Sequence, residues 1–152
     1  MDATQFIKEY GVEKAREVVS GAPEGVSLFE YIPICSGFSY IKIIDGIRYC
    51  FNPAANNWFV DNFKAEISFQ FNDIKRLVES VDLVNCNGVW NGTKNTITLF
   101  QSSLDLGLHH GVDGVDAEVE IPRLKQAIAD YEVIYSIPKS VRQAILNLEM
   151  HL

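Results

Sequence analysis

The segment FSYIKIIDGIRYCF, residues 38–51, predicts two β-strands joined by a tight turn at Asp45 and Gly46. A two-residue Asp-Gly loop favours a type I′ turn, because both central residues of that turn need positive φ. The turn fixes which residues of the two strands lie opposite each other. The predicted pairs are Ile44 with Ile47, Lys42 with Tyr49 and Tyr40 with Phe51 on one face, and Ile43 with Arg48 and Ile41 with Cys50 on the other. Both faces are largely apolar, so the rest of the chain must cover at least one of them.

The sequence on both sides of this hairpin predicts two further strands. Residues 26–34 alternate as a strand does, and residues 58–60 are a short apolar run after the turn-forming residues NPAANN at 52–57. The four strands predict an antiparallel meander that is rich in aromatic side chains. These are Phe29, Tyr31, Phe38, Tyr40, Tyr49, Phe51, Trp58, Phe59 and Phe63. Two interpretations are open: a sheet face that grips a peptide, base or small ligand, or an aromatic core beneath the helices.

Apolar residues recur at helical spacing in five segments of the chain. Before the strands, a first short helix is predicted that Asp2 or Thr4 caps and Gly11 ends, followed by a second that runs from Val12 and stops before Gly21. The two could instead form one kinked helix. A longer amphipathic helix is predicted at residues 73–84, and another begins at Pro122, a residue that suits the first position of a helix. A last helix is predicted from Ser140 onwards. The helices therefore lie on both sides of the strand-rich segment in the sequence.

The region between the two longer helices has no clear period. Residues 88–92 predict turns, residues 95–100 (NTITLF) a strand, residues 106–114 a loop and residues 117–121 another strand. Taken with the hairpin, the pattern predicts an α+β fold in one domain spanning residues 1–152. We expect a small antiparallel sheet of four to six strands with helices packed mainly on one of its faces.

Composition narrows the class of protein. The chain has 152 residues, of which 47% are hydrophobic and 22% charged, as in soluble globular proteins. Its formal net charge is −7, and no basic run is present to offset the repulsion of a phosphate backbone, which argues against direct nucleic-acid binding. No apolar run approaches the roughly 20 residues of a membrane span, and the start MDATQFIKEY lacks the features of a signal peptide. We therefore expect a cytoplasmic protein without membrane association.

Few residues of the sequence suit catalysis or metal binding. His109 and His110, followed by Asp113 and Asp116, form a local cluster of metal-type ligands, but adjacent histidines point apart in a strand and the loop offers few oxygens. Cys35 could act as a nucleophile only with a base beside it. We therefore predict no metal, no cofactor and no catalytic residue. A small-ligand-binding protein or hydrolase that uses Cys35, or His109 and His110, is kept as an alternative.

Two segments of the chain resemble known sequences. One is QFIKEYGVEKAREVV at residues 5–19 with APEG at residues 22–25, and the other is RLKQAIADYE at residues 123–132. Both resemble segments of small accessory proteins encoded by enterobacterial phages and prophages. The resemblance implies a protein that acts inside a bacterial host cell, often against or upon a host protein.

These observations favour a non-enzymatic protein that binds a host or phage protein. Its sharpest form is an inhibitor of a defence nuclease or of a DNA-processing enzyme. The predicted contact residues are Tyr40, Lys42, Tyr49 and Phe51 on an exposed sheet face, and the acidic loop residues Asp113, Asp116, Glu118 and Glu120. Such an acidic stretch could occupy a basic cleft of the partner as nucleic acid does. A further alternative is a homo-oligomeric structural protein, a homodimer formed through the aromatic sheet face.

Overall fold

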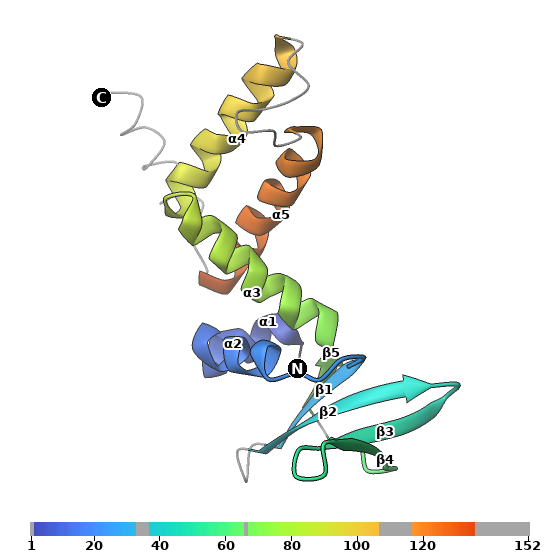
Figure 1. Ribbon diagram of the computed structural model, residues 1–152. Helices are drawn as coiled ribbons and strands as arrows, with labels where there is room; N and C mark the ends of the chain where they lie inside the picture. Colours follow the sequence, from blue (N-terminus) through green and yellow to red (C-terminus); the bar gives the residue numbers. More distant parts are fainter. Residues whose placement is uncertain (1, 33–36, 66, 107–116, 136–152) are drawn as a thin grey trace. The chain divides into compact units, whose positions relative to one another are not determined.

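The computed structural model describes residues 2–32, 37–65, 67–106 and 117–135, and it has the α+β fold that the sequence predicts (Figure 1). Contacts between residues divide the chain into two compact units, Met1–Val78 and Glu79–Leu152. The boundary falls within the helix α3, Phe71–Cys86. Compact units can belong to one domain, so the single domain expected for residues 1–152 stays a prediction.

The first unit begins with two helices that the sequence predicts correctly, α1 (Ala3–Tyr10) and α2 (Val12–Ser20). Asp2 caps α1, because its side chain accepts a hydrogen bond of 2.8 Å from the Gln5 amide while the Gln5 side chain accepts one from the Asp2 amide. Gly11 separates the two helices at a φ of 93°, a value that favours glycine. The two helices therefore start and stop where local sequence requires.

The described part of the first unit forms an antiparallel sheet in the order β4-β3-β2-β1-β5. The strands are β1 (Leu28–Ile32), β2 (Gly37–Ile44), β3 (Ile47–Asn52), β4 (Asn57–Val60) and β5 (Ile67–Gln70). Asp45 and Gly46 have φ values of 52° and 77°, and Lys42 lies opposite Tyr49, which confirms the predicted turn and register. β5 was not predicted from the sequence. It pairs with β1, so β1 lies inside the sheet, and β4 and β5 are the two edge strands.

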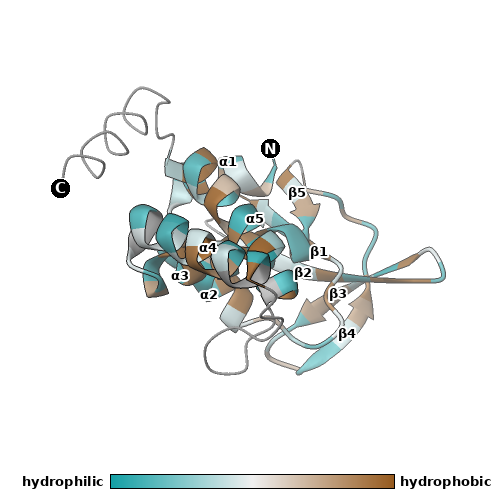
Figure 2. Ribbon diagram, turned by 90° about the horizontal axis from the view of Figure 1, so that it is seen from above, coloured by the Kyte–Doolittle hydropathy of each residue, from teal (hydrophilic) through white to brown (hydrophobic). Residues whose placement is uncertain are grey.

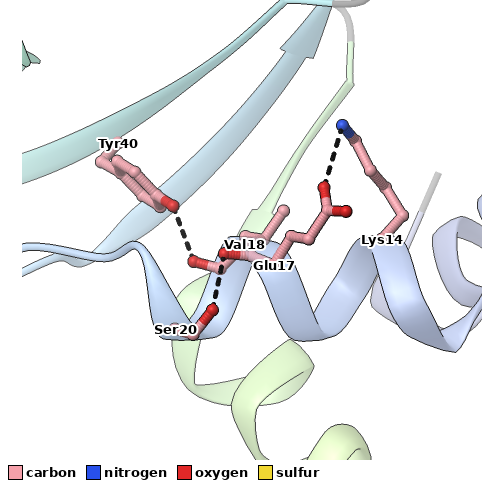
Figure 3. A network of polar contacts seen from close by, with 5 residues as sticks. All are labelled: Lys14, Glu17, Val18, Ser20 and Tyr40. Carbon is pink, nitrogen blue, oxygen red and sulfur yellow. Dashed lines mark hydrogen bonds and ion pairs between the residues drawn. The ribbon is translucent and has the colours of Figure 1, made fainter.

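Aromatic side chains join the helices α1 and α2 to one face of the sheet, which we call the helix side. The Phe6 ring centroid lies 5.4 Å from that of Phe29, 5.5 Å from that of Tyr31 and 5.3 Å from that of Phe69. Tyr40 donates a hydrogen bond of 2.7 Å from its hydroxyl to the Val18 carbonyl of α2 (Figure 3). Over β1, β2 and β5 the predicted aromatic core beneath helices is therefore present.

The opposite face of the sheet holds a buried ion pair. Arg48 Nη2 on β3 lies 2.5 Å from Glu30 Oε2 on β1, and Glu30 is only 3% exposed. Oε1 of Glu30 and Nε of Arg48 have no hydrogen-bond partner among the described residues. A buried charge without an opposite charge beside it is strongly destabilising, so removing either Glu30 or Arg48 alone should destabilise the fold.

The second unit packs the end of α3 with α4 (Val89–Asp105) and α5 (Ala117–Tyr135). Val84 of α3 forms a buried cluster with Ala127 and Ile128 of α5. Ser80 donates a hydrogen bond of 2.7 Å to Asp130 Oδ2, and both residues are buried. The predicted helix at residues 73–84 is confirmed, and so is the helix that follows Pro122.

Two predicted strands in this unit are wrong. Residues 95–100 belong to α4 and residues 117–121 to α5, and the turns predicted at 88–92 are replaced by the start of α4. Pro122 accordingly lies inside α5 and not at its first position. Threonine and isoleucine favour strands, but here the hydroxyls of Thr96 and Thr98 donate to the carbonyls four residues earlier, which satisfies both hydroxyls within the helix. The helix predicted from Ser140 and most of the loop predicted at 106–114 lie outside the described residues.

Candidate functional site

The helix side of the sheet continues past the helices onto β2, β3 and β4, where its side chains are partly open to solvent. Lys42 lies opposite Tyr49, Tyr49 opposite Val60, and Phe51 opposite Trp58. Residues paired across a sheet share a face, and Lys42 shares the face of Tyr40, two residues earlier. We call this surface, made of Lys42, Tyr49, Phe51, Trp58 and Val60, the aromatic patch.

Trp58 is the centre of the aromatic patch. Lys42 Nζ lies 4.5 Å from the centroid of the Trp58 ring, a distance typical of a cation–π interaction. The Phe51 ring lies 5.2 Å from Trp58 with the two planes tilted by 60°. Contacts from two neighbours restrict the rotamers of Trp58, while Val60 beside it is 62% exposed. The patch is thus a partly ordered aromatic surface that solvent still reaches.

The turn between β3 and β4 places Trp58 in this position. Asn52 Oδ1 accepts hydrogen bonds from the amides of Ala54, at 3.0 Å, and Ala55, at 3.2 Å. Asn56 adopts a positive φ of 47°, which asparagine tolerates better than most residues. The chain therefore reverses within a few residues and returns with Trp58 opposite Phe51. Hydrophobic segments, brown in Figure 2, recur along the β2–β3 hairpin and β4.

Three of the predicted contact residues, Lys42, Tyr49 and Phe51, meet on this patch. The exposure predicted for Tyr40 is wrong, because Tyr40 is 7% exposed and its hydroxyl is bonded to α2. Burial raises the pKa of the Tyr40 hydroxyl to about 12. The alternation of the strand identified the face of Tyr40 correctly, but only the position of α2 shows that this part of the face is covered.

Trp58 is not among the contact residues that the sequence predicts. Its place on the patch follows from the register of the β3–β4 turn, which pairs Phe51 with Trp58. The asparagine-rich turn was recognised in the sequence, but its length alone does not fix that register. If residues 53–56 are taken as a tight turn, Asn57 lies opposite Asn52 and Trp58 opposite Phe51, which places Trp58 on the same face as Phe51.

The acidic residues of the prediction lie elsewhere. Glu118 is exposed and Glu120 is partly exposed, and both belong to the first turn of α5 in the second unit and not to a loop. Glu120 Oε1 lies 3.8 Å from Arg123 Nη1, so one of these acids already has a cationic neighbour. Asp113 and Asp116 lie outside the described residues. The aromatic patch and the acidic residues thus belong to different units.

The residues of the enzymatic alternative, Cys35, His109 and His110, also lie outside the described residues, and their roles stay predictions. Within the described ranges, no group of three His, Cys, Asp or Glu side chains is placed to hold a metal. A shallow pocket of about 470 Å³ lies over β3, β4 and the turn between them. It is lined by Cys50, Phe51, Asn52, Pro53, Phe59 and Asp61.

No protein-family model, curated protein or solved structure matches the chain. The resemblance to phage accessory proteins therefore stays a prediction. None of the helices in the described ranges combines the length and hydropathy that crossing a bilayer demands. The aromatic patch is the feature on which a functional argument can be built.

Proposed function

We propose that this protein is a non-enzymatic binding protein that docks on another protein through the aromatic patch. The observation that supports the proposal is Trp58, held between Lys42 and Phe51 yet left accessible beside the exposed Val60. Tryptophan and tyrosine are enriched among the residues that contribute most to protein–protein affinity. A side chain already restricted by its neighbours also loses less entropy when a partner binds.

The chemistry of the patch suggests the kind of surface it binds. Tyr49, Phe51, Trp58 and Val60 fit an apolar recess, and the ammonium of Lys42 fits a carboxylate or carbonyl at its rim. An apolar interface depends little on ionic strength, because salt screens charges and leaves apolar burial largely intact. Binding through the patch is therefore expected to persist at high salt, whereas nucleic-acid mimicry by acidic residues would weaken steeply.

The proposed setting follows from the resemblance to phage and prophage proteins. An accessory protein of that kind acts inside the host cell, and its partner is then a host protein, with a defence nuclease or a DNA-processing enzyme as the sharpest candidates. The patch would act by occupying a surface that the host protein needs for its own work. This part of the proposal rests on the two resembling segments and not on the geometry.

The test compares two variants on opposite faces of the same sheet. Tagged wild-type protein, Trp58→Ala and Ile43→Ala are used to purify partners from an enterobacterial lysate, and the recovered protein is then titrated in purified form. Ile43 is the matched control, because it is 46% exposed and lies next to Lys42 on the face away from the patch. We expect Trp58→Ala to weaken binding at least about tenfold and Ile43→Ala to leave it unchanged.

The proposal fails if no protein is recovered with the wild type, or if Trp58→Ala and Ile43→Ala bind the recovered protein equally well. A binding constant that falls steeply between low and high salt would also count against the patch and favour the acidic residues. Circular dichroism of each variant establishes that a loss of binding is not a loss of folding.

A further inference from the structure

The strand β4 forms one edge of the sheet, and only one side of its backbone is paired. The amide of Asp61 donates a hydrogen bond of 3.1 Å to the Arg48 carbonyl of β3. Antiparallel ladders alternate, so Phe59 and Asn57 also direct their backbone groups toward β3, and the intervening residues Trp58 and Val60 direct theirs away. The backbone groups of Trp58 and Val60 therefore line the outer edge.

This edge lacks two of the usual protections against pairing with another strand, charged side chains and proline, although the strand is short. Residues 57–60, NWFV, carry no charge and no proline, and Phe59 and Val60 are 50% and 62% exposed. One local device is present, because Asn57 Oδ1 accepts a hydrogen bond of 2.8 Å from the outward amide of Trp58. The amide of Val60 also points outward, and no described residue accepts a hydrogen bond from it.

We propose that β4 pairs with β4 of a second copy of this chain, antiparallel and about a twofold axis between the two Phe59 residues. Each Trp58 then lies opposite Val60 of the second copy, and the outward backbone groups of both residues are paired. On the helix side Trp58 packs against Val60 of the other copy, and on the opposite side the two Phe59 rings meet. Apolar side chains are thus matched on both faces of the joined sheet.

Two features determine the register of the paired β4 strands: the number of outward backbone groups that become paired, and the charge of the side chains that lie opposite each other. A shift by one residue in each chain would centre the axis on Trp58 or on Val60 and would leave part of the outward edge unpaired. Only the register centred on Phe59 uses both outward residues of both copies. It also places Asn57 opposite Asp61 of the second copy, so each carboxylate meets an amide and not another carboxylate.

Self-complementarity favours a second copy over an unrelated strand as the occupant. The pairing needs Asn57 to exchange its bond with the Trp58 amide for a bond to the Asp61 carboxylate of the second copy. The paired segment is short, and interfaces well below about 1,200 Å² are typical of weak association. The dimer is therefore expected to form reversibly as the protein concentration rises. The inference is independent of the proposed function, although it would place two aromatic patches on one continuous sheet face.

The first experiment measures the mass of the full chain by sedimentation over a wide concentration range. The wild type is expected to move from 17.1 kDa toward twice that mass as the concentration rises. Val60→Pro removes only the outward amide, so the β3–β4 ladder is kept while the dimer dissociation constant rises at least about tenfold. Val60→Thr keeps that amide and is the control. A wild type that stays monomeric throughout overturns the proposal.

The second experiment tests the register. Asn57→Asp keeps an oxygen that can cap the Trp58 amide but sets it against Asp61 of the second copy, so we expect dissociation at low salt. The double variant Asn57→Asp/Asp61→Asn restores an acid opposite an amide and is expected to dimerise again. The proposed pairing is overturned if Asn57→Asp leaves the dimer dissociation constant unchanged at low salt, or if the double variant is folded but stays monomeric.

Discussion

Replacing Tyr40 with phenylalanine removes one hydroxyl group and leaves the ring that packs beneath α2. The hydroxyl donates to the Val18 carbonyl at 2.7 Å (Figure 3). This carbonyl lies in the last turn of α2. The Gly21 amide there bonds to the Glu17 and Val19 carbonyls and not to the Val18 carbonyl. Carbonyls at a helix end need a partner from outside the helix, and Tyr40 supplies it for Val18.

The size of the effect follows from the bond and its burial. A neutral hydrogen bond contributes about 1 kcal/mol to the free energy of unfolding, and a buried acceptor left without a partner costs about 1–3 kcal/mol. The ring of phenylalanine fills the same space, so no cavity term is added. We therefore expect Tyr40→Phe to lower the free energy of unfolding by about 1–2 kcal/mol at neutral pH.

The same residue makes stability depend on pH. Burial raises the pKa of Tyr40 to about 12, above its unfolded value of about 10. Below pH 10 the hydroxyl is neutral in both states and its contribution is fully present. As the pH rises toward 12 the unfolded state ionises first, so the wild type loses roughly 2 kcal/mol of stability that Tyr40→Phe does not lose.

The assay is urea unfolding of wild type, Tyr40→Phe and Tyr49→Phe from pH 7 to pH 11.5, followed by circular dichroism. Tyr49 is the control, because it lies partly exposed on the aromatic patch and the loss of its hydroxyl is expected to change stability by less than about 0.5 kcal/mol. The stability gap between wild type and Tyr40→Phe should narrow with rising pH. A gap that is absent at pH 7, or that stays constant to pH 11.5, would refute the assigned role of Tyr40.

Two further predictions concern buried polar contacts. Arg48→Met leaves the Glu30 carboxylate buried without its cation and should lower the free energy of unfolding in urea by about 3–5 kcal/mol. The double variant Glu30→Leu/Arg48→Met should recover most of that stability, and a double variant no more stable than Arg48→Met would contradict the prediction. Ser80→Ala removes the hydroxyl that donates to Asp130 and should lower the free energy of thermal unfolding by about 1–2 kcal/mol. Ser102→Ala, at an exposed position, should lower it by less than about 0.5 kcal/mol, and equal effects of the two variants would contradict the role of Ser80.

Apart from β5, the helices and strands of the first unit could be predicted from the sequence because local chemistry determines them. Asp45 and Gly46 allow only a few turn geometries, and the turn sets the register of the strands on either side. Gly11 and Asp2 mark helix ends through their own backbone and side-chain preferences. Each of these signals acts within a few residues, so neighbouring sequence is enough to interpret it.

The errors fall where distant contacts override local preference. Thr96 and Ile97 favour a strand, but Ile97 packs against the cluster around Val84, a contact that exists only when residues 89–105 are helical. The exposure of Tyr40 was misjudged for the same reason, since α2 covers it from another part of the chain. Likewise, the membership of Trp58 in the patch depends on pairing between strands and not on its own neighbours.

Partner binding through the patch and dimerisation through the sheet edge both involve β4. Because side chains alternate between the faces of this strand, different residues can be substituted to test each one. Trp58 contributes its side chain to the patch and its backbone to the outer edge, whereas Asn57 and Asp61 face away from the patch. A protein whose partner binding falls with Trp58→Ala but not with Asn57→Asp binds through the patch as a monomer. If Asn57→Asp weakens both dimerisation and partner binding, and the double variant with Asp61→Asn restores both, the dimer presents two patches to one partner and binds by avidity. The rescue decides between these cases, because the double variant leaves every residue of the patch unchanged.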